Sequence, residues 1–239
     1  MMDGLYVRLR KMPHEVLFEL AKKLGVFDGL IAFGRCDNGH LYFDLRIRGV
    51  VRRAEAGKHE LQWRRGSDVI GDDFDMVSSE IRSRLAAYPH LLWYANSNGY
   101  TLKGGEYYDG CDFRLFAPDG SVADEVEVKC RVEEKTAKGV ITYDMAYFYS
   151  DEHPIYLNEN KQGTATLYYT QTRDGYGLLF RISENDGVKP ITVPLTNEIK
   201  TNETITKNVI LFNCVTRKPI AYWTPWCVDS KKMLGIKAL

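Results

Sequence analysis

The sequence has no C-x-x-C pair and no long apolar run. Its cysteines are odd in number and irregularly spaced, which argues against a disulfide framework or a zinc knuckle, so we expect small, mostly buried side chains at Cys36, Cys111, Cys130, Cys214 and Cys227. No stretch approaches the roughly 18 apolar residues of a membrane span, and the N-terminal region lacks the apolar segment of a signal peptide. These absences predict a cytoplasmic protein that does not span a membrane.

Several catalytic motifs are also missing. There is no Gly-x-Gly-x-x-Gly and no phosphate loop, so we expect no nucleotide cofactor, and the Gly-x-Ser-x-Gly elbow of serine hydrolases is absent. His14-Glu15 is not followed by the second histidine of a metalloprotease helix. The remaining histidines have no metal-ligand spacing and are interpreted as structural or surface residues: His40, His59, His90 and His153.

The net charge is zero, but the charges are unevenly distributed. Residues 1–70 carry 13 Lys and Arg against 9 Asp and Glu, residues 71–130 carry 5 against 11, and residues 131–239 carry 14 against 12. An acidic centre between basic flanks suits a cation site beside a surface that binds a polyanion. Ordinary solvated faces can produce the same distribution.

The composition favours a single mixed domain that is rich in strands. Aromatic residues make up 12% of the chain, fifteen of them tyrosines, and neither an internal repeat nor a low-complexity linker divides residues 1–239. The first helix is marked by Pro13 at its start, by Gly25 at its end, and by one apolar face made of Val16, Leu17, Leu20, Ala21 and Leu24.

An arginine-rich N-terminal subdomain is expected over residues 1–70. Residues 40–53 and 58–66 alternate like two strands, and they carry a group of six arginines: Arg46, Arg48, Arg52, Arg53, Arg64 and Arg65. Guanidinium groups match phosphate oxygens, so this patch is a candidate DNA-binding surface. The alternative is a solvated sheet face in which Glu55 and Glu60 pair with the arginines.

A second helix is expected over residues 76–88. Asp75 is a plausible cap, and Pro89 is expected to end the helix. Glu80 falls in the first turn, where an acid complements the helix dipole.

Residues 111–117 and 122–130 alternate between apolar and charged side chains, which predicts a hairpin. Pro118-Asp119-Gly120-Ser121 is a tight-turn signal, and a two-residue Asp119-Gly120 loop gives a register in which paired residue numbers sum to 239. Asp112 then lies opposite Glu127, whereas a shifted turn with the sum 237 would place it opposite Glu125 on the same face. The apolar face would hold Phe113, Leu115, Val126 and Val128, and the charged face Asp112, Arg114, Glu125, Glu127 and Lys129.

Two opposed acids repel one another, so a purely structural hairpin would gain by exchanging one of them. A divalent metal would remove this penalty, and Mg²⁺ prefers one or two carboxylates plus waters and a substrate phosphate. Lys129 projects to the same side as Glu127, where it can orient a water or neutralise charge at phosphorus. The alternative is that Arg114 and Lys129 merely balance the acids on a solvated face.

Asp112, the hairpin turn and Glu127-Val128-Lys129 together resemble the restriction-endonuclease-like, or PD-(D/E)xK, nuclease superfamily. That resemblance implies an α/β fold, a mixed sheet flanked by helices, with the nuclease core over residues 75–172. Within this core, residues 100–108 are expected to form the strand before the hairpin, residues 135–150 a second helix of ambiguous pattern, and residues 164–172 the next strand. Residues 173–239 are expected to form a β-rich C-terminal extension.

The resemblance also implies roles for individual residues. Asp112 and Glu127 would hold Mg²⁺, Lys129 would assist the attacking water, and Glu80 would be a further metal-binding acid. Cys111 stands where a proline often precedes the first acid, and no Gln-x-x-x-Tyr follows, so the resemblance to the exonuclease branch is weaker.

The function expected from this resemblance is sequence-specific, Mg²⁺-dependent cleavage of double-stranded DNA, as in type II restriction endonucleases, by a homodimer. Two alternatives stay open: a non-catalytic β-rich nucleic-acid-binding or regulatory protein, and an RNA-directed nuclease of the same fold. Late aromatic residues are candidates for base stacking but are more often core residues: Tyr222, Trp223 and Trp226.

Overall fold

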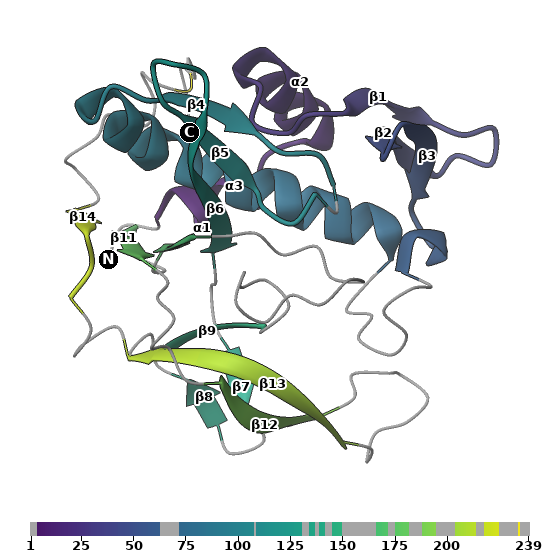
Figure 1. Cartoon of the computed structure of the whole chain (residues 1–239). Helices are drawn as coiled ribbons and strands as arrows, with labels where there is room; N and C mark the ends of the chain where they lie inside the picture. Colours follow the sequence, from purple (N-terminus) through teal and green to yellow (C-terminus); the bar gives the residue numbers. More distant parts are fainter. Residues whose placement is uncertain are drawn as a thin grey trace.

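The structure is a computed structural model (Figure 1). It describes residues 4–62, 72–107, 109–130, 166–171, 175–181, 218–224 and Leu234, together with the backbone of the strands at 134–136, 139–141, 145–149, 188–194 and 204–213. The helical elements are α1 (Leu5–Leu9), α2 (His14–Leu24), the 3-10 turn η1 (Glu60–Gln62) and α3 (Asp73–Ser97). The fold is mixed α/β.

A six-stranded mixed sheet is the largest sheet of the described chain, with the order β14-β11-β10-β6-β5-β4. Its strands are β4 (Thr101–Gly104), β5 (Phe113–Phe116), β6 (Val122–Cys130), β10 (Leu167–Gln171), β11 (Gly177–Arg181) and β14 (Ala221–Trp223). β6 and β10 pair in parallel, and the other neighbours pair antiparallel. The strands predicted near residues 100–108, in the hairpin and at 164–172 are confirmed.

Three smaller sheets complete the described strands. One is a meander of β1 (Leu30–Arg35), β2 (Leu41–Ile47) and β3 (Val50–Glu55). The second has the order β12-β13-β9, from β9 (Met145–Tyr149), β12 (Val188–Pro194) and β13 (Thr204–Asn213), and the third pairs β7 (Glu134–Thr136) with β8 (Gly139–Ile141). Residues 173–239 contain β11, β12, β13 and β14, so the expectation of strands there is confirmed, but β11 and β14 belong to the six-stranded sheet.

Two expectations about residues 58–66 and 135–150 are wrong. The part of 58–66 that the structure describes contains the turn η1 rather than a strand, and residues 63–66 lie outside the described chain. The expected second helix is replaced by the strands β7, β8 and β9 in the described parts of its range. β-branched and aromatic residues favour strands, and here that preference decides the outcome.

Helix α2 has the predicted ends, and Leu17, Leu20 and Ala21 of its predicted apolar face are buried, but Val16 is exposed. Helix α3 is longer than expected. Pro13 precedes α2, and Gly25 ends it in the left-handed conformation. In α3 the capping side chain is that of Asp72, which accepts from the Asp75 N–H (2.8 Å), and the helix continues through Pro89 to Ser97. A proline in a helix interior costs about 3 kcal/mol. Burial of Leu91 and Ala95 beyond it offsets that cost.

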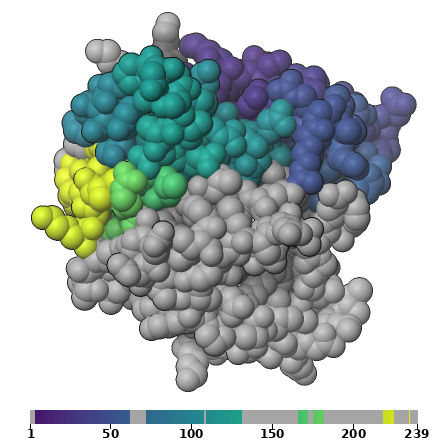
Figure 2. Space-filling view, viewed as in Figure 1, coloured from purple at the N-terminus to yellow at the C-terminus, as the bar shows by residue number. Residues whose placement is uncertain are grey.

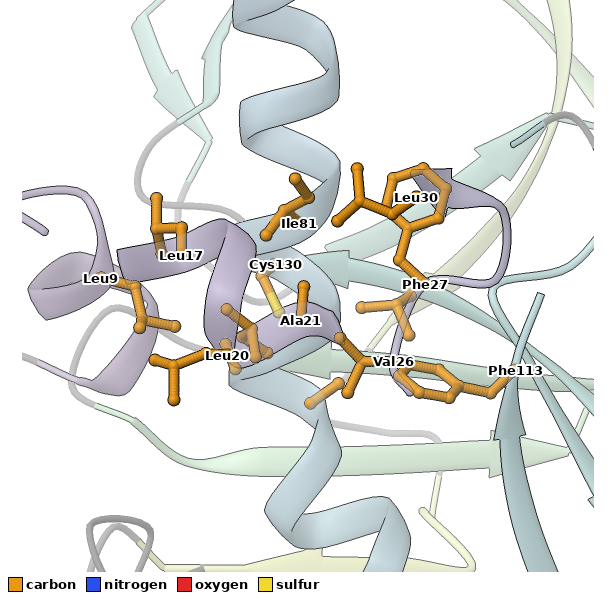
Figure 3. Packing of buried hydrophobic residues seen from close by; sticks show 14 of the residues in the cluster. Leu9, Leu17, Leu20, Ala21, Val26, Phe27, Leu30, Ile81, Phe113 and Cys130 are labelled. Carbon is orange, nitrogen blue, oxygen red and sulfur yellow. The ribbon is translucent and has the colours of Figure 1, made fainter. Parts of the chain in front are cut away.

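The hydrophobic core draws residues from the N-terminal segment, the central sheet and the C-terminal strands. Figure 3 shows Leu17 and Ala21 of α2, Ile81 of α3 and Cys130 of β6 as members of one buried cluster. α3 packs against both the six-stranded sheet and the β1–β3 meander. A single long helix thus links the two regions, which fixes its polar residues relative to the hairpin.

Cys111 and Cys130 are buried free thiols, as expected, and Cys36 is partly exposed. Burial raises the pKa of both buried thiols. Cys214 and Cys227 lie outside the described residues. Among the helices that the structure describes, none has the length and apolar character needed to cross a bilayer.

Candidate active site

The β5–β6 hairpin has the predicted register at the end that carries the acids. Phe113 lies opposite Val126, and Arg114 lies opposite Glu125. The predicted apolar face is buried in full, and it comprises Phe113, Leu115, Val126 and Val128. Asp112 therefore lies immediately before β5, beside the segment of β6 that carries Glu127 and Lys129.

The loop of the hairpin differs from the prediction. The Ala117 N–H donates to the Ser121 carbonyl and the Gly120 N–H donates to the Ala117 carbonyl (both 2.9 Å), so three residues form the loop instead of two. Gly120 has φ of 85°, in the left-handed region that suits glycine. A register shift then leaves Ala123 unpaired as a bulge. The longer loop shifts the pairing by one residue, and the bulge shifts it back, so the predicted register is restored from Leu115 to Phe113.

Asp112 is buried, and both oxygens of its carboxyl group accept hydrogen bonds. The Val128 N–H donates to Oδ2 (2.7 Å), and Arg84 Nη2 donates to Oδ1 (3.0 Å). Because β5 begins only at Phe113, the Val128 amide lies beyond the last pair of the β5–β6 ladder. The Asp112 side chain takes the place of a strand partner there, which holds the carboxyl group against β6.

Arg84 of α3 is the central cation of the site, and it was not among the predicted residues. Its side chain is 2% exposed. Nε donates to Glu80 Oε1 (2.8 Å), Nη2 to Asp112, and Nη1 to the Gly105 carbonyl (2.5 Å), while the guanidinium lies 4.4 Å from the Phe27 ring centroid. A buried arginine with this many partners holds the helix, β4 and the hairpin together.

The sequence contains a signal for Arg84. It falls among the apolar residues Val77, Ile81 and Leu85 on the buried side of α3, where a charge must find partners. Glu80 lies four residues before it, the spacing at which helix side chains meet. What the local pattern does not contain is the distant partner Asp112.

Glu127 and Lys129 form an ion pair through Lys129 Nζ and Glu127 Oε1. Their side chains are 10% and 26% exposed, respectively, so Glu127 is buried and the lysine reaches solvent. Both project from the same face of β6, as the strand period requires. Arg114, on the same hairpin, pairs instead with Glu125 (2.8 Å) and Asp109 (2.5 Å).

Glu80 has a different role from the predicted one of dipole complement. It lies in the second turn of α3 and accepts from Arg84. Burial acts to raise the pKa of Glu80, but the charge of Arg84, hydrogen bonding with Asp112 and the charge of Lys129 outweigh it and lower the pKa to about 2. Glu80 is therefore ionised and belongs to the same cluster as the hairpin residues.

The cluster contains three carboxyl groups, of Glu80, Asp112 and Glu127, and two cations, Arg84 and Lys129. Burial, followed by the charges of Glu127 and Glu80, raises the pKa of Asp112 well above its ordinary range despite Arg84. Asp112 is therefore the carboxyl group that most readily retains a proton. The cluster has one more carboxyl group than cations, so a further bound cation would balance its charge when all three carboxyl groups are ionised.

These residues fit a Mg²⁺ site of the two-carboxylate type. Mg²⁺ needs only one or two carboxylates, with waters and phosphate oxygens completing its shell, and the donor set here is entirely oxygen. Across the described residues, no three Asp, Glu, His or Cys side chains form a ready-made metal-binding group. Each of the three carboxyl groups already accepts a hydrogen bond, from Arg84, the Val128 N–H or Lys129, so a metal ion would share its ligands with these donors. The predicted pair Asp112 and Glu127 remains the candidate ligand pair.

The arginine patch is only partly available for binding. Arg53 pairs with both oxygens of Asp44 (2.8 and 3.0 Å), and Arg46 pairs with Asp28 (3.1 Å) and Glu106 (2.7 Å). Arg48 and Arg52 are exposed on the β2–β3 hairpin, at one outer end of the described surface (Figure 2). Glu55 pairs with Lys58 (2.9 Å) rather than with an arginine. Arg64 and Arg65 lie outside the described residues.

The described aromatic residues near the C-terminus include one core residue and one surface residue. Trp223 is buried and stacks on His90 with ring centroids 5.1 Å apart, so it belongs to the core. Tyr222 is exposed and stacks on Tyr176, and Trp226 lies outside the described residues. His90 Nδ1 contacts the Tyr169 hydroxyl (2.6 Å), and burial lowers its pKa to about 4. Its role is structural, as expected.

Comparison of the chain with protein-family models, with curated proteins and with solved structures gives no match. The functional argument therefore depends on the residues of the site.

Proposed function

We propose that the chain is a Mg²⁺-dependent endodeoxyribonuclease of the PD-(D/E)xK type, cleaving double-stranded DNA in the manner of a restriction endonuclease. The observation that carries the proposal is the burial of Asp112 and Arg84 within the acidic cluster, where they are 7% and 2% exposed. A hairpin face that merely balanced its charges in solvent would leave such groups exposed. Burying several charges brings little stability, and perturbed carboxyl groups concentrate at functional sites.

In this proposal each residue has a distinct task. Asp112 and Glu127 hold the metal ion, which when bound supplies a Lewis acid for the phosphodiester and a more acidic water. Lys129, at the solvent side of the cluster, positions the water and neutralises charge that develops at phosphorus. Arg84 fixes the Asp112 carboxyl group through Oδ1 and keeps Glu80 beside it.

Substrate contacts are proposed at the exposed arginines of the β2–β3 hairpin, Arg48 and Arg52. We further propose a homodimer, since cutting both strands of a symmetric sequence requires two active sites related by a two-fold axis. The nuclease core is proposed for residues 75–172, with β10 as the strand parallel to β6.

The test is cleavage of plasmid and bacteriophage DNA with Mg²⁺ or with EDTA. We expect discrete Mg²⁺-dependent fragments, and losses of at least about 100-fold in Glu127→Gln and Lys129→Met. Asp119→Asn, on the loop of the same hairpin, and Lys23→Met, on an exposed turn of α2, are matched controls that should keep full activity.

Thermal melting of each variant establishes that it is folded. Intact DNA under all metals tested, with folded protein, would reject the nuclease and favour the non-catalytic binding protein. A parallel incubation with duplex RNA decides between the two nucleic acids, because an RNA-directed enzyme would cut only that substrate.

A further inference from the structure

A second group of basic side chains lies where α1, α2 and α3 meet. Arg82 of α3 contacts His14, the first residue of α2, with Arg82 Nη2 and His14 Nε2 3.0 Å apart. Arg10 at the end of α1 is close enough for its charge to act on Arg82. Since an arginine is always a donor, His14 Nε2 accepts and the imidazole is neutral. We call Arg10, His14 and Arg82 the α1–α3 basic corner.

Arg82 is half-buried, and no acid among the described residues forms an ion pair with it. Within the described parts of the chain, no carboxylate lies within ion-pair distance of Arg82 or Arg10. Arg82 Nε is buried without a hydrogen-bond partner. Burial lowers the pKa of Arg82, Tyr6 and Asp75 raise it, and Arg10 lowers it further. The guanidinium therefore carries a charge that its surroundings disfavour.

Several other arginines among the described residues differ from Arg82 because they pair with acids. Arg84, two residues further along α3, binds two carboxylates, and Arg53, Arg114 and Arg181 each pair with at least one acid. A partly buried charge without a counter-ion is unfavourable unless something supplies the opposite charge. A guanidinium fork matches the oxygens of a phosphate group.

The basic corner neighbours the candidate active site. The Tyr6 hydroxyl of α1 lies 3.4 Å from Ser79 Oγ, the residue before Glu80. The Tyr6 N–H donates to Gln171 Oε1 (3.1 Å), and Gln171 pairs with Cys130, the residue after Lys129. Tyr6, which also acts on the charge of Arg82, thus links α1 to the residue before Glu80 and to the strand that pairs with the end of β6.

We propose that the α1–α3 basic corner binds a phosphate group, and, resting on the proposed nuclease function, that this phosphate belongs to the backbone of the DNA substrate beside the scissile bond. Arg82 and Arg10 supply the donors. The corner anchors the strand without reading bases, because phosphate contacts fix position and carry no sequence information.

The test uses the full chain with a fluorescein-labelled duplex in EDTA, so that binding is measured without cleavage. Arg82→Gln is expected to weaken binding about tenfold and to reduce the slope of log K against log salt by about one. Lys23→Gln, which removes the same charge from the far end of α2, should change binding by less than about twofold. Arg10→Gln should act in the same direction as Arg82→Gln.

A thermal shift with inorganic phosphate, against chloride at equal ionic strength, separates the possible sources of the phosphate. The wild type should melt higher in phosphate and Arg82→Gln should not. In chloride, Arg82→Gln should melt no lower than the wild type, because the removed charge had no counter-ion. A clear drop in melting temperature with unchanged binding to phosphate and DNA would mean that Arg82 only docks α2 on α3, and would overturn the proposal.

A phosphate shift that depends on Arg82 while DNA binding does not would overturn the assignment to a DNA backbone and point to a free phosphate compound. The phosphate-site proposal and the nuclease proposal can also be rejected independently of each other. Loss of DNA binding in Arg82→Gln without any Mg²⁺-dependent cleavage by the wild type keeps the phosphate site and rejects the nuclease. Cleavage by the wild type together with unchanged DNA binding by Arg82→Gln keeps the proposed nuclease and rejects the phosphate site.

Discussion

Replacing Arg84 with methionine should destabilise the protein by about 3–5 kcal/mol, the cost of removing one partner from a buried ion pair. Methionine keeps much of the apolar stem, so the loss reports on charge and hydrogen bonding. The change leaves Glu80, Asp112 and the Gly105 carbonyl without their shared donor. The free energy of unfolding of a domain is typically about 5–15 kcal/mol, so this loss would be a large fraction of the total.

The measurement is urea unfolding at 25 °C, followed by far-UV circular dichroism and tryptophan fluorescence. Arg82→Met is the matched control, because it removes the same charge from the same helix where no carboxylate is paired, and its free energy of unfolding should change by less than about 1 kcal/mol. In the double variant Arg84→Met with Asp112→Asn, part of the loss should return, with a coupling of about 0.5–3 kcal/mol.

Equal, small losses for Arg84→Met and Arg82→Met would refute the reasoning, since the network around Arg84 would then contribute nothing to the fold. A large loss without any coupling to Asp112 would assign the effect to the backbone carbonyls instead.

Three other predictions follow from described features. Burial lowers the pKa of His90 to about 4 from its ordinary 6.5, so between these pH values the unfolded chain binds more protons than the folded one. The free energy of unfolding should therefore fall by roughly 3 kcal/mol as the pH drops through that range. Urea titrations of His90→Gln should lack this part of the pH dependence, and an unchanged slope would contradict the prediction. Gly104→Ala should cost about 1–3 kcal/mol, because a methyl group there meets the Val26 backbone, whereas Thr101→Ala on the exposed part of β4 should change melting little. Arg48→Asn should stabilise the fold by about 0.5–1 kcal/mol, since Arg48 has φ of 51° and asparagine tolerates that conformation; the same variant should bind DNA more weakly in anisotropy titrations, and unchanged binding would remove Arg48 from the proposed surface.

The parts of the fold that the sequence predicts well are those set by short-range alternation. The β5–β6 hairpin was predictable because the alternation excludes every register that differs by one residue, and the turn signal selects among the rest. Helix α2 was predictable because its apolar residues and Gly25 are local signals. These features depend on neighbours within a few residues, so a single sequence contains them.

The features that were missed depend on distant contacts. Pro89 does not end α3, because the apolar residues after it find a core that the local pattern cannot reveal. Arg84 binds Asp112, 28 positions away, and the counter-ions of Arg46 come from Asp28 and Glu106. Local sequence indicates that a buried charge needs a partner, but only the folded chain shows which residue supplies it.

The three-residue loop and the bulge at Ala123 have a consequence for recognising relatives of this chain. The apolar pairs set the register that places Asp112 beside the segment of β6 that carries Glu127, while the loop and the bulge absorb differences in hairpin length. Insertions or deletions at the far end of the hairpin can therefore accumulate during evolution without moving the acids. A search pattern for such homologues should specify which residues face each other and let the number of residues between the two acids vary.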